Sequence, residues 1–212
     1  MSKKNTRTSS QDSKSPIVIS VAKYGLVGTL ITALFGLAGV GLTAYLNNPV
    51  VVIPIKTLSV TFLTSHSRYV TAMDNQAGWN WQLRAETKNL GEWEKFLLSC
   101  VDDSQVAFID YHRRYVTAMD DQAGQKWELR AETKNLGEWE KFTLVETKTG
   151  RELLCSAVFK LLQQGSVAVA IKTYHGRYVT AMDDQAGQKW ELRAETKNLG
   201  EWEKFMMIPL AP

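Results

Sequence analysis

The sequence predicts an all-β domain, a β-trefoil of three near-identical lobes with four short strands each, and three observations predict it. The first is a stretch of the chain, residues 114–142, that recurs without a change at 177–205. A third copy, 68–96, differs at only four positions, where Asn75, Trp79, Asn80 and Gln82 replace Asp121, Gln125, Lys126 and Glu128. Repetition of one unit at this length indicates an architecture built from copies of one structural element.

The second observation is the alternation of apolar and charged residues inside each copy. Trp127, Leu129 and Ala131 alternate with charged residues, and Trp190, Leu192 and Ala194 of the last copy repeat the pattern. A period of two is typical of a half-buried strand, whereas an amphipathic helix needs apolar residues at three- and four-residue spacing. We therefore expect strands here, with the tryptophans of the three copies, Trp81, Trp127 and Trp190, on the buried face.

Turn-forming residues are the third observation. In the last copy His175-Gly176, the run DDQAG at 183–187 and the run KNLG at 197–200 separate four short segments. Gly, Asn and Asp favour the backbone reversals that such turns need. Propellers also use four-stranded units but typically need about four to eight of them. Three units therefore favour a closed trefoil barrel, which leaves no strand edge exposed.

The three lobes are not evenly spaced along the chain. Their first strands begin near Val60, Val106 and Val169, which gives spacings of 46 and 63 residues. The longer spacing indicates an insertion between the second and third lobes. We place the domain and its parts at these ranges: the trefoil at 58–209, its lobes at about 58–101, 104–147 and 167–209, and the insertion at about 149–166.

The insertion has the pattern of a short amphipathic helix. Thr149 and Glu152 form a capping-box pattern at its start, and Gly165 is a stop signal. Its apolar residues share one helical face: Leu153, Leu154, Ala157, Val158, Leu161 and Leu162. Two roles stay open for that face, which either packs on the trefoil or contacts a partner or a membrane surface.

A single transmembrane helix is predicted ahead of the trefoil. Residues 24–46 carry no charge over 23 positions, and at about 1.5 Å per residue they can cross a hydrocarbon core of about 30 Å. A cleaved signal peptide has a shorter apolar region and small residues before the cut, and Leu42 stands where a small residue is needed. We favour an uncleaved anchor, followed by a linker at 47–57.

The residues ahead of that span, 1–23, form a polar tail that we expect to be disordered. The tail carries a net charge of +4, against +3 for the whole chain, so the remainder is close to neutral. The positive-inside rule places the tail in the cytoplasm and the trefoil outside. A nearly neutral trefoil argues against nucleic-acid binding. Gly28, Thr32 and Gly36 put small residues on one face of the span, which favours a homodimer through it.

Two cysteines, Cys100 and Cys155, lie outside the three copies. In an oxidising compartment they form a disulfide, and otherwise they are two small buried residues. The sequence leaves both alternatives open. Their number and spacing match no metal-binding signature, and we expect neither a metal nor a cofactor.

The motifs of the repeat resemble those of a known family. The run HGRYVTA at 175–181, followed by a hairpin and LGEWEKF at 199–205, closely resembles the repeat of fascin and fascin-like β-trefoils, whose lobes read roughly HNGKYV-A and GPWEKF. The architecture of that family is ricin-B-like. The resemblance covers about residues 58–208 apart from the insertion, and it implies actin-filament binding or crosslinking.

The first two copies depart from the family pattern at the first turn, where Ser67 and Arg113 stand in place of Gly176. The resemblance also implies core and interlobe packing for the aromatic residues of the GEWEKF motif. These predicted core aromatics are Trp93, Phe96, Trp139, Phe142, Trp202 and Phe205.

Polar turn residues and one unusual tryptophan are the candidate ligand-binding residues. Trp79 replaces a glutamine in a turn, where its ring could stack on a sugar. Trefoil lectins commonly hold sugar hydroxyls with one acidic and one aromatic residue per lobe. The alternative is that the polar residues only stabilise hairpin turns. The turn candidates are Asp74, Asn75, Asp120, Asp121, Gln122, Asp183, Asp184 and Gln185.

No catalytic constellation stands out in the sequence. Glu138 and Glu140 flank a tryptophan, but near-identical lobes would give three equivalent patches instead of two carboxylates with different roles. His66, His112 and His175 occupy the first turn of each lobe, either as solvated residues or as a pH switch at one end of the barrel.

We therefore expect a non-enzymatic binding module, anchored in the membrane and displayed at the cell surface, for carbohydrate or a protein partner. Two alternatives remain: fascin-like actin binding with the trefoil in the cytosol, and a structural or adhesive spacer.

Overall fold

The computed structural model describes residues 57–75, 78, 80–122, 126–184 and 189–211. They belong to one unit, Ile55–Pro212. The predicted tail and membrane span, 1–23 and 24–46, lie outside the described residues. Within the part of the chain that the structure describes, no helix is long and apolar enough to cross a membrane.

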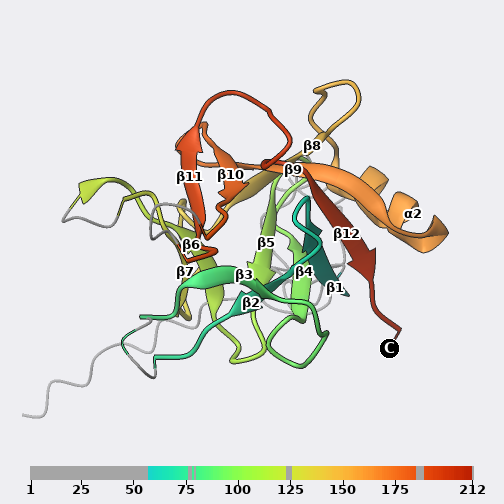
Figure 1. The fold of residues 1–212 in the computed structure, drawn as a ribbon. Coiled ribbons are helices and arrows are strands. Elements are labelled where there is room, and N and C mark those ends of the chain that lie inside the picture. Colours follow the sequence, from blue (N-terminus) through green and yellow to red (C-terminus); the bar gives the residue numbers. More distant parts are fainter. Residues whose placement is uncertain (1–56, 76–77, 79, 123–125, 185–188, 212) are drawn as a thin grey trace, which may run out of the picture. The chain divides into compact units, whose positions relative to one another are not determined.

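Twelve strands and one helix make up the described fold (Figure 1). Each predicted lobe contributes four strands, and the helix lies in the predicted insertion. In chain order the elements are β1 (Thr57–Thr64), β2 (Tyr69–Ala72), β3 (Leu83–Thr87), β4 (Phe96–Cys100), β5 (Val106–Ile109), β6 (Tyr115–Ala118), β7 (Leu129–Thr133), β8 (Phe142–Glu146), α2 (Cys155–Gln164), β9 (Val167–Thr173), β10 (Tyr178–Ala181), β11 (Leu192–Thr196) and β12 (Phe205–Pro209).

The first and last strands of each lobe form a closed six-stranded barrel. Going round it, β1 pairs with β4, β4 with β5, β5 with β8, β8 with β9, β9 with β12 and β12 with β1, all antiparallel. The two middle strands of each lobe form a hairpin: β2–β3, β6–β7 and β10–β11. Closure pairs every barrel strand on both sides. The twelve strands and this closed barrel confirm the predicted trefoil architecture.

Backbone contacts join the three hairpins around the threefold axis. The amide of Ala131 donates to the carbonyl of Trp81 at 2.8 Å, and the same bond recurs from Ala194 to Trp127 and from Ala85 to Trp190. Each of these alanines is fully buried. A larger side chain there would have no space, so the small residue at this repeated position allows the three strands to converge.

Each lobe supplies the same apolar positions to the core. Phe96, Phe142 and Phe205 are 1–2% exposed, and Phe62 contacts the rings of Phe96 and Phe108 at centroid distances of 5.8 and 5.2 Å. The phenylalanines of the GEWEKF motif thus lie in the core. Aromatic pairs of this geometry add about 0.5–1.5 kcal/mol each beyond the area they bury.

The insertion forms a helix, but a shorter one than its sequence predicts. Its start at Cys155 follows an extended segment, in which Leu153 donates its amide to Leu144 of β8 at 2.8 Å. The predicted capping box is wrong, because Thr149 bonds Glu146 and Glu152 pairs with Lys172 at 3.0 Å. Thr149 lies in the turn after β8, and the pairing of Arg151, Glu152 and Leu153 with β8 delays the helix. The helix ends at Gly165 as predicted.

The buried face of α2 packs on the trefoil. Cys155, Val158, Phe159 and Leu162 are all buried and belong to the hydrophobic core, and the helix lies beside β12 (Figure 1). This face therefore fills the first of its two predicted roles. Leu154, predicted on the same face, is 56% exposed because it precedes the first helical turn.

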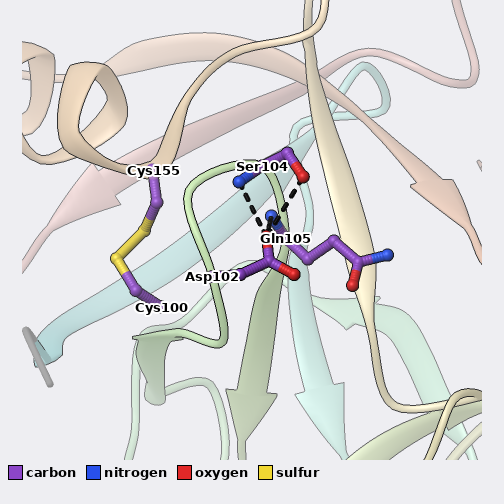
Figure 2. The surroundings of a disulfide bond; sticks show 5 residues. All are labelled: Cys100, Asp102, Ser104, Gln105 and Cys155. Carbon is purple, nitrogen blue, oxygen red and sulfur yellow. Dashed lines mark hydrogen bonds between the residues drawn. A yellow bond between two sulfur atoms is a disulfide. The ribbon is translucent and has the colours of Figure 1, made fainter. Parts of the chain in front are cut away.

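A disulfide joins Cys100, at the end of β4, to Cys155, at the start of α2 (Figure 2). The turn beside it is ordered by Asp102, whose carboxylate accepts hydrogen bonds from the amides of Ser104 and Gln105 at 2.8 and 2.7 Å. Desolvation by partial burial raises the pKa of the Asp102 carboxyl, but these hydrogen bonds lower it and the net shift is downward. Of the two alternatives that the sequence leaves open for these cysteines, the structure shows the disulfide.

Candidate functional site at the three lobe junctions

The two glutamates of each GEWEKF motif have different structural roles. Glu140 is 7% exposed; it accepts a hydrogen bond from the Thr117 hydroxyl at 2.8 Å and one from the Gly137 amide at 2.7 Å. Glu138 points outward and pairs with Lys141 on the surface. The other two lobes repeat both arrangements. The buried glutamate therefore holds the loop in place, and this loop carries the tryptophan that stands between the two glutamates in sequence.

The tryptophans of this motif lie at the junctions between lobes. Trp93, Trp139 and Trp202 are 37%, 38% and 41% exposed, so they do not lie in the core but occupy the interlobe position that the resemblance also implies. The carbonyl of Trp139 accepts a hydrogen bond from Ala118 at 3.0 Å, which ties its loop to β6. Its ring lies 5.4 Å from that of His175, in the next lobe. The ring is held in place yet keeps an open side.

A second tryptophan reaches each junction from the hairpin turn. Trp127 has φ 60° and comes just before β7, so it is half-buried in the turn and not on the buried face of a strand as predicted. Its ring lies 5.6 Å from His175 and under the guanidinium of Arg177, which is 4.1 Å from the ring centroid. Trp81 and Trp190 have the same conformation and half-buried environment. The cation–π contact helps to hold a turn conformation that L residues rarely adopt.

Each junction therefore holds two tryptophans of one lobe against a histidine and an arginine of the next. We number the junctions in chain order: the first joins lobes one and two, the second joins lobes two and three, and the third joins lobe three to lobe one. The first junction holds Trp81, Trp93, His112 and Arg114; the second holds Trp127, Trp139, His175 and Arg177; the third holds Trp190, Trp202, His66 and Arg68.

The three histidines occupy separate junctions. His175 and His66 bond through Nε2 to the carbonyls of Ala118 and Ala181, both at 3.2 Å. The buried Nε2 of His112 has no hydrogen-bond partner in the part of the chain that the structure describes. All three rings are partly buried between tryptophans, so the solvated-turn alternative does not describe them, and the pH switch stays a prediction.

The junctions differ in the residue that precedes the histidine. Tyr111 and Tyr174 are 52% and 53% exposed and lie 5.6 and 5.7 Å from the neighbouring histidine rings. Ser65 stands at this position in the third junction. The first two junctions thus present an additional open aromatic ring. Sequence reasoning missed both tyrosines, although each directly precedes a repeated histidine.

The first junction has a further difference, a buried aspartate at the end of β5. Asp110 is 3% exposed and stands where the other lobes have Thr64 and Thr173. One oxygen accepts the amide of Arg114 at 2.7 Å, and the buried Oδ2 has no hydrogen-bond partner among the described residues. Desolvation by burial raises the pKa of Asp110, although that hydrogen bond and the charges of His112 and Arg114 oppose the shift.

The predicted turn candidates lie in the loops between the hairpin strands. Asp120 accepts the amide of Gln122 at 2.9 Å, which is the bond of a turn-stabilising aspartate. Asp74 and Asp183 are partly buried, whereas Asn75, Asp121, Gln122 and Asp184 are exposed. Trp79 and Gln185 lie outside the described residues. Ligand binding at these loops stays a prediction. No group of side chains suited to hold a metal ion occurs among the described residues.

No protein-family model matches the chain, and no curated protein matches its sequence. Its fold is similar to that of solved structures. A designed threefold-symmetric protein, ThreeFoil, matches with a TM-score of 0.54 at 9% identity, over 72% of this chain and 99% of that one. A mosquitocidal holotoxin matches with a TM-score of 0.54 at 8% identity, over 76% of this chain but 18% of the toxin chain. At such identities the likeness concerns the fold alone, and the fascin-like assignment stays a prediction.

Proposed function

We propose that this protein is a membrane-anchored, non-catalytic binding module that holds carbohydrate at its lobe junctions. The observation that carries the proposal is the set of three half-exposed tryptophans, Trp93, Trp139 and Trp202, held by a buried glutamate loop and a neighbouring histidine. Large aromatic rings are usually buried, so a ring that is fixed and yet open in every lobe points to a ligand.

The chemistry at the edge of each open ring suits a sugar. A pyranose has an apolar C–H face that packs on an aromatic ring and hydroxyl groups that need hydrogen-bond partners at its rim. In the sequence of the GEWEKF motif the tryptophan stands between a glutamate and a lysine that form a surface ion pair, as Glu138 and Lys141 do on either side of Trp139. Charged groups at the rim of an aromatic platform supply the polar contacts that orient a ligand.

Membrane anchoring rests on the uncharged segment 24–46 and on the basic residues ahead of it. Display of three similar junctions on a membrane surface would raise the apparent affinity through avidity, because a second contact becomes intramolecular. Weak individual sites therefore suffice for attachment to a glycan layer.

The test is a glycan array and titration with the full-length protein in detergent, comparing wild type with Trp93→Ala, Trp139→Ala and Trp202→Ala. Loss of one stacking platform should weaken binding at that junction roughly tenfold. The triple variant should lose attachment to a glycan-coated surface.

Leu154→Ala is the matched control, since Leu154 is a large exposed apolar residue on the insertion, in none of the junctions. Thermal unfolding of each variant confirms that the fold persists. If the triple variant binds glycans as wild type does, or if no glycan binds, the carbohydrate proposal is wrong. Binding to a protein partner that the same three substitutions abolish would then replace it.

The competing proposal is a fascin-like, actin-binding trefoil in the cytosol. It is supported by the recurrence of HGRYVTA and GEWEKF, and it requires the opposite topology. Protease treatment of intact cells decides between the two: digestion of the trefoil favours surface display, and full protection favours the cytosolic alternative.

A further inference from the structure

A cavity of about 210 Å³ lies beside the first junction, where β1, β4 and β5 meet. Its polar lining comes from Ser59, Lys95, Asp110, Tyr111 and Arg113. Tyr111 is the open ring that also touches His112 of the first junction. The cavity therefore extends the aromatic cluster of that junction and adds polar and charged groups to it.

Arg113 is the residue that most distinguishes this place from the other two junctions. It has φ 63°, and its counterparts Gly176 and Ser67 have φ 71° and 55°. All three lobes thus use the same left-handed turn, for which glycine is the unstrained choice. The second lobe keeps a long charged side chain in a backbone conformation that disfavours it. Strain of this kind is retained more often at functional positions than elsewhere.

The charges around the cavity leave Arg113 available. Lys95 is paired with Glu92, and Arg114 stacks on Trp81 and donates to the carbonyl of Glu132. Among the residues that the structure describes, the exposed Arg113 in contrast bonds only through its amide, which donates to the carbonyl of Asp110 at 3.0 Å. A guanidinium at the mouth of a small cavity favours a carboxylate, which it can hold through two parallel hydrogen bonds.

The remaining groups suit the rest of a sugar ring. Tyr111 offers an aromatic face, and the hydroxyl of Ser59 can bond a sugar hydroxyl. The Asp110 carboxyl is buried and bonded to the amide of Arg114, so a ligand in the cavity meets the exposed Arg113 and not that carboxyl.

We propose that the cavity at the first junction selects acidic saccharides, with the sugar ring on Tyr111 and its carboxylate on Arg113. The inference rests on the proposed function and specifies it: neutral glycans would bind at any junction, whereas a uronic or sialic acid would prefer the first. The second junction has the tyrosine but a glycine in place of the arginine, and the third has neither.

The experiment titrates full-length protein with sialic-acid-terminated and glucuronic-acid-terminated oligosaccharides, each beside its carboxyl-reduced neutral form. Wild type should bind the acidic forms about tenfold more tightly, and added salt should shrink that difference. Arg113→Gly, which copies the turn of the third lobe, should bind the acidic and neutral forms alike. Because glycine relieves the strained turn, this variant should unfold at the same temperature as wild type or a higher one.

Gly176→Arg in the Arg113→Gly background is the complementary variant, since it moves the guanidinium to the second junction beside Tyr174. It should restore a preference for acidic forms. An undiminished acidic preference in Arg113→Gly would overturn the inference, as would a wild type that binds neutral and acidic forms equally. If wild type binds neutral and acidic forms equally, the carbohydrate proposal stands without the acidic selectivity. If no glycan binds, both the carbohydrate proposal and the acidic selectivity are rejected.

Discussion

At the scale of single residues, the buried glutamates show how a motif that resembles a catalytic pair can be structural. Glu94, Glu140 and Glu203 are 6–7% exposed, and each accepts one hydroxyl and one amide hydrogen bond. The geometry of the junction tryptophans depends on these bonds. A sequence shows that a glutamate recurs, but it does not show which of two neighbouring glutamates turns inward.

Glu140→Ala should lower the free energy of unfolding by about 2–4 kcal/mol, because it leaves the Thr117 hydroxyl and the Gly137 amide without their partner. Glu138→Ala is the matched control. That side chain is 56% exposed and pairs only at the surface, so its removal should cost less than about 0.5 kcal/mol. Urea unfolding measures both, and equal losses would contradict the assignment of the two roles.

Asp110 gives the fold a pH dependence of definite sign. Burial raises its pKa above the ordinary 3.8, so the folded protein binds the proton more tightly than the unfolded chain does. The stabilising effect of this proton is complete below pH 3.8 and is lost as pH rises through the raised folded value. Asp110→Thr, which copies the other two lobes, should therefore gain stability relative to wild type as pH rises from 3 to 7. Urea unfolding across that range tests it, and a constant difference between the two proteins would reject it.

At the scale of elements, the strands and turns were largely predictable and the insertion only in part. Alternation and turn residues locate the four strands of each lobe, because strand faces and backbone reversals are local properties. The start of α2 is not determined by local sequence. Residues of its predicted first turn pair with β8 instead, and a capping pattern cannot reveal a competing strand partner. The misplaced tryptophans have a similar cause, since Trp127 continues the alternation of β7 but lies in the turn before it.

The disulfide fixes this helix to the barrel, and its loss should destabilise the whole domain. Cys100 and Cys155 are 55 residues apart in sequence, and a loop of that length corresponds to about 4 kcal/mol of stabilisation, chiefly through the unfolded chain. Cys100→Ser/Cys155→Ser should lower the free energy of unfolding by that amount. A reducing agent should do the same to wild type and leave the double variant unchanged. Equal stability of oxidised and reduced wild type would contradict this role.

At the scale of the whole molecule, the three copies predict a threefold fold, and the differences between them predict where to look for function. The identical stretches 114–142 and 177–205 form equivalent strands, turns and core positions. The junctions could not be derived from sequence, because each is made by residues of two lobes that are distant in the chain. The distinguishing residues Tyr111 and Arg113 lie just outside the copied stretch, where the lobes diverge.

The pairing of the first strand with the last has a mechanical consequence. In that antiparallel pair Val60 lies opposite Pro209 and Thr64 opposite Phe205, so the two ends of the domain are neighbours. Tension applied between Thr57 and Pro209 would peel β1 from β12 one bond at a time, since the load reaches one end of the pair first. Tension from a ligand in the first junction enters through β4 and β5 instead, and reaches β1 through its pairing with β4. A load carried between a tether before β1 and that junction therefore bypasses the pair that opens most easily.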